Sequence, residues 1–138
     1  MPGYLLDTNI LSELRKRNPS RAVAAWFDSV SDDDVYLSVL TVGELRQGIE
    51  RLRPRHPERA SDYDHWLGEL LLGYRDHIAD IDREVADEWG RLNRTRTLPV
   101  VDGLLAATAR VRKWTMVTRN VRDFPPEVDL LNPFEPPA

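Results

Sequence analysis

The chain contains no cysteine, which excludes disulfide bonds and thiolate metal ligands. No apolar run approaches the roughly 18 residues that a membrane-spanning helix needs. No basic segment precedes the first apolar stretch, so we expect no signal peptide. The three histidines lack metal-ligand spacing. These absences favour a cytoplasmic protein that makes no membrane contact.

Lysine is scarce: of the 19 basic residues, all except Lys16 and Lys113 are arginine. The net charge of −4 argues against a protein that coats nucleic acid by bulk electrostatics. It is compatible with an enzyme that acts on nucleic acid, because a metal bound among acids reverses the local charge. The arginine excess favours bidentate phosphate contacts, but a GC-rich genome gives the same bias and is the preferred explanation.

Strand-like and helix-like segments alternate along the 138 residues. This alternation is typical of an α/β fold with a largely parallel sheet. The strands that we expect are residues 3–7, 35–39, 78–81, 115–118 and 128–131. We expect a single domain over residues 1–138, with residues 133–138 as a frayed tail.

Three expected helices carry clear local signals. Asp82 is placed to cap a helix, since its carboxylate can accept from free backbone N–H groups. Apolar residues between Tyr63 and Tyr74 follow an i, i+3, i+4, i+7 pattern, which predicts a face packed on the core, with a partner-binding face as the alternative. Residues 103–111 are small and apolar nearly all round, which predicts a helix buried on most sides.

Four acidic residues from remote parts of the chain each follow a strand-like segment. Asp7 and Glu44 follow the first and second strands, Asp102 follows the run Leu98–Val101, and Asp123 follows the strand at 115–118. Ligands of open α/β sheets bind at the carboxyl ends of the strands. The four carboxylates are therefore expected to converge on one cleft.

Helix capping offers a simpler explanation for each acid taken alone. Thr41-x-x-Glu44 matches a capping box, so we expect Thr41 to begin a helix. Asp102, in contrast, precedes a helix that must be buried, and a carboxylate there needs a cation or strong donors to stay ionised. Several convergent carboxylates suit Mg²⁺ or Mn²⁺, and two such ions can promote phosphodiester hydrolysis.

Four motifs occur in order and cover nearly the whole chain. They are Leu5-Leu6-Asp7-Thr8-Asn9, Ser38-x-x-Thr41-x-x-Glu44-Leu45, Asp102-x-x-x-Ala106-Ala107 and Thr118-Arg119-Asn120-x-x-Asp123-Phe124. Together they resemble the motifs of PIN-domain nucleases, and more narrowly those of the VapC/FitB-type toxins of bacterial toxin–antitoxin pairs.

The resemblance implies a three-layer α/β/α PIN-like fold whose central, mostly parallel sheet has about five strands. It implies a metal-dependent endoribonuclease that hydrolyses RNA with Mg²⁺, or Mn²⁺, held by a carboxylate cluster. A cognate antitoxin would inhibit it, and a homodimer is the expected assembly. Carried over residue by residue, Asp7, Glu44 and Asp102 become the catalytic, metal-binding acids.

The last motif departs from the family pattern. Many family members place an acid where this chain has Asn120, whereas here Asp123 is the acidic residue of the motif. Asp123 is therefore the expected fourth catalytic and metal-binding acid, with Thr118 and Asn120 positioning it. Arg119 lies inside the motif and is expected at the cleft. In the first motif, Asn9 is placed to orient Asp7 through its amide.

Three other functions are compatible with an acid at a strand end. A phosphorylated receiver domain is disfavoured because the chain lacks an acid pair in its early strand and a lysine after its late one. A hydrolase with an aspartyl nucleophile would need an acid two residues after Asp7, where Asn9 stands. A catalytically weak PIN-like module that binds protein or RNA stays open, because Asn120 replaces an acid.

Overall fold

The computed structural model describes residues 2–135 and centres on a five-stranded sheet. All four strand pairings are parallel, and the strand order is β3-β2-β1-β4-β5. The strands are β1 (Tyr4–Leu6), β2 (Val35–Ser38), β3 (Ile78–Ala79), β4 (Thr115–Val117) and β5 (Leu130–Leu131). The predicted parallel α/β class and the number of strands are confirmed.

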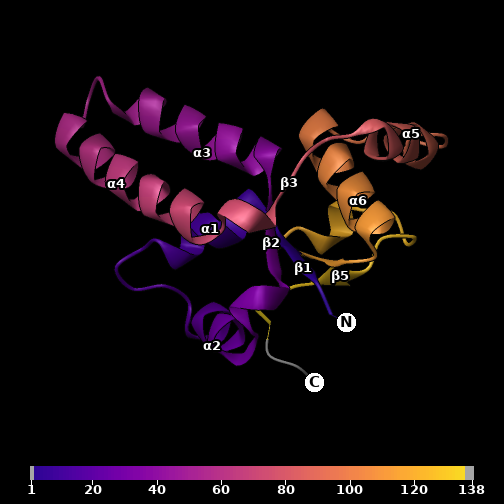
Figure 1. The fold of residues 1–138 in the computed structure, drawn as a ribbon, viewed down its shortest axis with the longest axis horizontal. Helices are drawn as coiled ribbons and strands as arrows, with labels where there is room; N and C mark the ends of the chain where they lie inside the picture. The colour runs from indigo at the N-terminus through magenta and orange to yellow at the C-terminus, as the bar shows by residue number, and fades with distance from the viewer. Residues whose placement is uncertain (1, 136–138) are drawn as a thin grey trace.

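Helices cover both faces of the sheet (Figure 1). The helices are α1 (Thr8–Leu14), α2 (Arg21–Ser29), α3 (Val39–Leu52), α4 (Pro57–Gly73), α5 (Arg83–Leu92) and α6 (Val100–Arg112). Short 3₁₀ turns span Asp32–Asp34, Arg75–His77 and Val121–Asp123. No helix within residues 2–135 combines the length and the apolar character needed to cross a membrane.

The alternation of side chains along each strand produces two separate cores. Leu6 and Leu37 pack with the helices α1 to α4 on one face. Leu5 and Met116 pack with α5 and α6 on the other, because successive strand residues point to opposite faces. The result is the three-layer α/β/α architecture expected from the sequence. Figure 1 shows the two helical layers on opposite sides of the sheet.

The strand order places a topological switch point between β1 and β4. From β1 the chain adds β2 and β3 on one side, and it later adds β4 and β5 on the other. Leu6 pairs with Val117 in register, so both strands end at the same level. In open α/β sheets, the crevice at the carboxyl ends of strands beside such a point is the usual ligand site.

The hairpin of α3 and α4 extends away from the sheet (Figure 1). Pro57 occupies the first turn of α4, where its missing N–H and fixed φ are tolerated. Leu67 is buried, and most of the apolar side chains from Tyr63 to Tyr74 pack against the same core. This confirms the prediction that this face of the helix is core. Asp82 caps α5 as predicted, accepting from the N–H of Val85 at 3.0 Å.

Two local predictions are wrong. Helix α3 begins before Thr41, because Ser38 already caps it by accepting from the N–H of Leu40 at 3.1 Å. The capping box at Thr41 and Glu44 therefore does not form. Residues 98–101 are not a strand either: Pro99 takes the N-cap position of α6, so Asp102 lies in the first turn of that helix.

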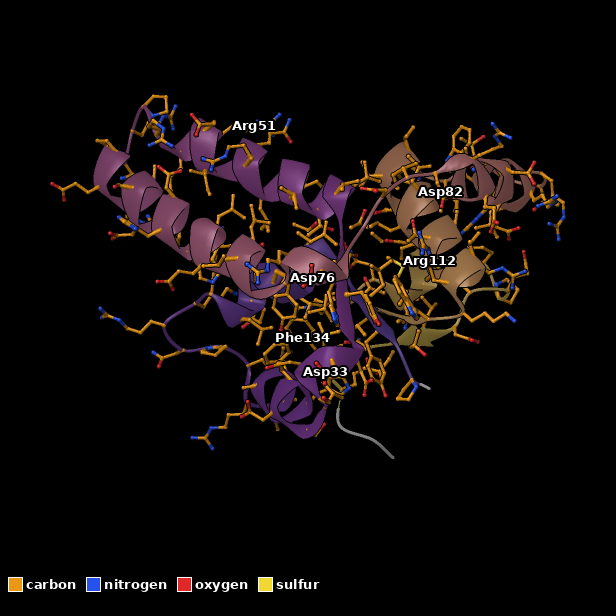
Figure 2. All side chains as sticks on the ribbon, in the orientation of Figure 1. Asp33, Arg51, Asp76, Asp82, Arg112 and Phe134 are labelled. Atoms are coloured by element: carbon orange, nitrogen blue, oxygen red, sulfur yellow. The ribbon has the colours of Figure 1, made fainter. Side chains whose placement is uncertain are left out.

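Of the frayed tail expected at residues 133–138, residues 133–135 are described, and Phe134 makes contacts with the rest of the fold. The N–H of Phe134 donates to Oδ1 of Asn132 at 3.0 Å, and the ring packs against the first core. In Figure 2, Phe134 lies between α2 and the centre of the molecule, whereas Arg51 points outward from α3. Residues 136–138 lie outside the described residues.

Candidate active site

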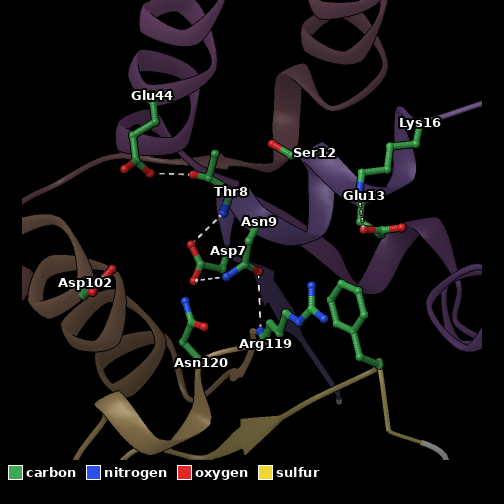
Figure 3. Close-up of a pocket in the computed structure, with 11 residues that line it drawn as sticks. Asp7, Thr8, Asn9, Ser12, Glu13, Lys16, Glu44, Asp102, Arg119 and Asn120 are labelled. Atoms are coloured by element: carbon green, nitrogen blue, oxygen red, sulfur yellow. Dashed lines mark hydrogen bonds and ion pairs between the residues drawn. The ribbon is translucent and has the colours of Figure 1, made fainter. Parts of the chain in front are cut away.

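A cavity of about 460 Å³ opens where the first strand passes into the first helix. Asp7, Glu44 and Asp102 line it, and they belong to three different parts of the fold (Figure 3). The other lining residues are Thr8, Asn9, Ser12, Glu13, Lys16, Arg119, Asn120 and Phe134. Three of the four acids predicted from the sequence therefore share one cavity.

Asp7 is buried and held by three hydrogen-bond donors. Its Oδ1 accepts from the N–H of Thr8 at 2.7 Å, which makes Asp7 the N-cap of α1. Its Oδ2 accepts from the hydroxyl of Thr118 at 2.8 Å and from the amide of Asn9 at 3.3 Å. Thr118 directly follows β4, so its bond to Asp7 spans the switch point between β1 and β4. Asn9 therefore lies beside Asp7 as expected, whereas Thr118, which was expected to position Asp123, bonds to Asp7 instead.

Thr8 connects two of the acids. Its hydroxyl donates to Oε1 of Glu44 at 2.5 Å, while its N–H donates to Asp7. Glu44 lies inside α3 rather than at its cap, so its carboxylate is free to reach across to α1. The backbone and the side chain of one residue therefore hold two carboxylates that are 37 positions apart in the sequence.

Asp102 and Asp123 form the other side of the acidic region. Asp102 lies in the first turn of α6, which favours a negative charge at the helix N-terminus. Asp123 is exposed and does not line the cavity, although its charge acts on Asp102. The backbone carbonyl of Asp123 accepts from Arg96 at 2.6 Å. Asn120, not Asp123, is the residue of this segment that lines the cavity.

The pKa values of Asp7 and Asp102 are both raised. Burial is the main cause of the raised pKa of Asp7; hydrogen bonds from Thr118 and Thr8 oppose it. The charges of Asp102 and Glu44 then raise it further. Burial likewise raises the pKa of Asp102, followed by the charges of Glu44 and Asp123. The cavity thus holds carboxylates that resist ionising together.

Glu13, the fourth acid that lines the cavity, pairs with Lys16, but Asp7, Glu44 and Asp102 lack compensating cations within the described chain. Within residues 2–135, none of these three forms an ion pair. A carboxylate offers about four acceptor positions, and the three donors on Asp7 leave its Oδ1 with one to spare. The described residues provide no hydrogen-bond donor to the carboxylate of Asp102. Hard oxygen donors with unused lone pairs and mutual repulsion fit a divalent cation.

The acids are spread around the cavity rather than gathered tightly. In the part of the chain that the structure describes, no three Asp, Glu or His side chains stand close enough to hold one metal ion as they are. Mg²⁺ in proteins commonly uses one or two carboxylates together with water and substrate phosphates. An open arrangement of acids therefore suits Mg²⁺ better than it suits a metal that needs a closed protein cage.

Sequence reasoning missed four lining residues and the role of a fifth. Ser12, Glu13, Lys16 and Phe134 line the cavity, and Thr8 bridges two acids. Thr8 stands in the first motif between Asp7 and Asn9, and this position is the signal that could have singled it out. Nothing in the local sequence of Phe134 indicates that it reaches the cavity, because its contact with the site depends on tertiary packing.

The matched family agrees with this geometry. Comparison with protein families matches residues 4–125 to the PIN domain. The chain belongs to the PIN domain family. The matched range contains all four motifs and every acid discussed above, so the resemblance expected from the sequence is confirmed.

Relatives of this PIN domain match it over nearly their whole length. VapC ribonuclease Y4jK of Sinorhizobium fredii is 33% identical, with 96% of this chain and 98% of the relative covered. Toxin FitB of Neisseria gonorrhoeae is 32% identical, with 94% and 97% covered. Among solved structures, FitAB bound to an IR36 DNA fragment superposes with a TM-score of 0.89 at 30% identity and covers 98% of both chains.

Proposed function

We propose that this PIN domain is a metal-dependent endoribonuclease toxin of a toxin–antitoxin pair. The observation that carries the proposal is a cavity beside the sheet's switch point that is lined by Asp7, Glu44 and Asp102, none of which forms an ion pair within residues 2–135. Relatives named as a ribonuclease and as a toxin support it. Mg²⁺, or Mn²⁺, is the proposed cofactor, since carboxylate oxygens are the ligands that these ions prefer.

The four acids divide into metal ligands and supporting groups in this proposal. A bound divalent cation would activate water and stabilise the charge that develops on the phosphate. Asp7 and Asp102 would hold it, because both carry raised pKa values that a neighbouring positive charge would relieve. Glu44, fixed by the hydroxyl of Thr8, would bind metal or orient the attacking water. Asp123 would add negative charge beside Asp102 from outside the cavity.

The remaining parts of the proposal concern partners. RNA is the proposed substrate, and a cognate antitoxin is the proposed inhibitor, in keeping with relatives named as toxins. We propose that the chain acts as one PIN-like domain, in the cytoplasm, and assembles as a homodimer. Thr118 and Asn9 support Asp7, and Asn120 joins them through its N–H, which donates to the hydroxyl of Thr118 at 3.1 Å.

A catalytically weak binding module is the competing function. Asn120 favours it, because this residue lines the cavity where many family members carry an acid. An amide adds no negative charge, so the cavity would attract a cation less strongly than a site with a fourth carboxylate. Such a module would bind RNA or protein and would cleave slowly or not at all.

A cleavage assay separates the two functions. Purified protein is incubated with structured RNAs in Mg²⁺, in Mn²⁺ and in EDTA, beside the variant Asp7→Asn. We expect cleavage that requires metal and that Asp7→Asn abolishes, because the variant removes a charged ligand but keeps the N-cap acceptor. Asp64→Asn, on the exposed face of the α3–α4 hairpin, is the matched control. Cleavage that survives both EDTA and Asp7→Asn would rule out the acidic metal mechanism.

A further inference from the structure

Two basic side chains line the otherwise acidic cavity, and they differ in how their charge is balanced. The ammonium of Lys16 lies 2.9 Å from Oε1 of Glu13, so its charge is largely compensated. Arg119 forms no ion pair with any acid among residues 2–135, although its charge contributes to the lowered pKa of Glu13. Arg119 is therefore the cavity's uncompensated cation within the described chain. Figure 3 shows it on the opposite side of Asp7 from Asp102.

The guanidinium of Arg119 is held by an aromatic ring. Its central carbon lies 4.3 Å from the centre of the Phe134 ring, within the range of a cation–π contact. The ring is itself tied down, because the N–H of Phe134 donates to Oδ1 of Asn132 at 3.0 Å. The amide of Asn132 in turn reaches the carbonyl of Arg119 at 3.4 Å. Asn132 thus joins the segment after β5 to the segment after β4.

The backbone of Arg119 is also linked to the acids. Its N–H points at Oδ1 of Asn9 at 3.4 Å, and the amide of Asn9 donates to Asp7. The preceding residue, Thr118, donates its hydroxyl to the same carboxylate at 2.8 Å. The position of Arg119 relative to Asp7 is therefore fixed by two neighbouring contacts. These contacts do not involve its side chain, so replacing the guanidinium leaves them in place.

An RNA strand that approaches three carboxylates meets repulsion between its phosphates and the acids. A stacked guanidinium presents one covered face and a free edge of N–H donors, which matches the oxygens of a phosphate in a bidentate manner. We propose that Arg119, positioned by Phe134, is a binding subsite for a backbone phosphate of the RNA strand that lies across the cavity. This inference rests on the proposed function and adds to it the residue that grips the substrate.

The proposal gives Arg119 and Phe134 different experimental signatures. Arg119→Ala removes a charged contact, so we expect KM for RNA cleavage to rise about 10-fold with little change in kcat. We also expect the dependence of RNA binding on salt to weaken by about 0.7 in the slope of log K against log salt. Arg119→Lys keeps the charge but loses the planar guanidinium, so its KM should lie between those of the wild type and Arg119→Ala.

Phe134 acts through Arg119 and touches no substrate in this scheme. Phe134→Leu should raise KM about 3-fold, as expected for the loss of a cation–π contact, and should leave the salt slope unchanged because the charge remains. Phe134→Tyr keeps an aromatic ring and should restore the wild-type KM. Circular-dichroism melting of each variant checks that the fold persists.

The experiment uses a fluorescein-labelled RNA hairpin with single-stranded tails. Binding is measured in the Asp7→Asn background across a salt series, and cleavage is measured in the otherwise unmodified protein. Arg59→Ala, which removes an exposed arginine on α4, is the matched control and should change neither quantity. The proposed subsite is wrong if the protein cleaves RNA and Arg119→Ala leaves KM and the salt slope at wild-type values. Absent cleavage with Arg119-dependent binding would instead refute the nuclease function and support the subsite.

Discussion

The α3–α4 hairpin and the cavity are both rich in carboxylates, but they differ in whether those carboxylates have cationic partners. On the hairpin, Arg46 contacts Asp64 at 2.6 Å and Glu50 at 3.2 Å. Arg53 contacts the same two acids at 2.9 Å and 2.7 Å. Hydrogen bonds from Arg53 lower the pKa of Glu50, and those from Arg46 lower the pKa of Asp64. Glu50 and Asp64 therefore each contact two arginines, which favour the charged forms of these two carboxylates.

In the cavity, Asp7, Glu44 and Asp102 form no ion pair with any residue of the range 2–135, whereas Glu13 pairs with Lys16. Burial raises the pKa values of Asp7 and Asp102, and the neighbouring acids raise them further. Ion pairs near the surface, such as those of the hairpin, contribute little to stability, but each charge in them is neutralised by its partner. We propose that missing compensation inside the cavity, rather than acidity alone, distinguishes the functional acids. Pairs of substitutions, one in each region, test this distinction.

The largest effect is expected from matched glutamates. Glu44→Gln removes an uncompensated carboxylate from the cavity, and we expect RNA cleavage to slow at least about 100-fold. Glu50→Gln removes a paired carboxylate from the hairpin and should leave cleavage unchanged. The measurement is the single-turnover rate at saturating protein. Equal rates for the two variants would show that lack of pairing does not distinguish these acids.

Thr8 should show an intermediate effect, because it acts on the acids through hydrogen bonds. Thr8→Val removes the hydroxyl that donates to Glu44 but keeps the shape and the N–H that donates to Asp7. We expect about a 10-fold loss of cleavage rate, typical of residues that orient metal-binding groups. Thr8→Ser keeps a hydroxyl and should restore most of the rate. A full rate in Thr8→Val would mean that Glu44 needs no such support.

A substitution in the cavity that lowers the cleavage rate should raise the stability of the fold. In the absence of metal, Asp7→Asn relieves repulsion among the carboxylates and ends the burial of a charge, and its melting temperature should rise by about 3 °C, or roughly 1 kcal/mol. Asp64→Asn removes a half-exposed, paired charge and should shift the melting temperature by less than about 1 °C. Melting in EDTA gives both values. A lower melting temperature for Asp7→Asn would contradict mutual repulsion.

The difference in stability between Asp7→Asn and the wild type should also depend on pH, and this is the smallest effect that we expect. The pKa of Asp7 is raised on folding, so between its ordinary value of 3.8 and the raised value the folded protein holds a proton that the unfolded chain has lost. Stability from this group is therefore lost as the pH rises through that window. The advantage of Asp7→Asn over the wild type should accordingly shrink as the pH falls from neutral toward about 4. An advantage that grows on acidification would reverse the assigned sign.

Much of the site was predictable because strand ends of a parallel sheet meet at one edge. Asp7 follows β1 and Glu44 follows β2 by a turn and a half of helix, so the alternation of strands and helices was sufficient to bring them together. Asp102 was predicted to follow a strand, but it lines the cavity from the first turn of α6. The run before it is apolar and β-branched like a strand, but Pro99 ends it and begins α6.

The details that were missed depend on contacts between distant residues. Both Ser38 and Thr41 carry a hydroxyl that could cap α3. Ser38 is the cap because β2 ends at this residue and the helix begins at Val39. The bond from Thr8 to Glu44 and the stack of Arg119 on Phe134 join segments that only the folded chain brings together. The motifs place Thr8 and Arg119 near the cleft, but they do not indicate which distant residue each side chain contacts.

The central claim is that the uncompensated carboxylates of the cavity form a divalent-metal site. Its most direct test is isothermal titration calorimetry of Mn²⁺ into the wild type, Asp7→Asn and Asp64→Asn. We expect saturable binding to the wild type and to Asp64→Asn, and at least about a 10-fold weaker affinity in Asp7→Asn. Equal affinity in all three proteins, or no binding to the wild type, would contradict the account.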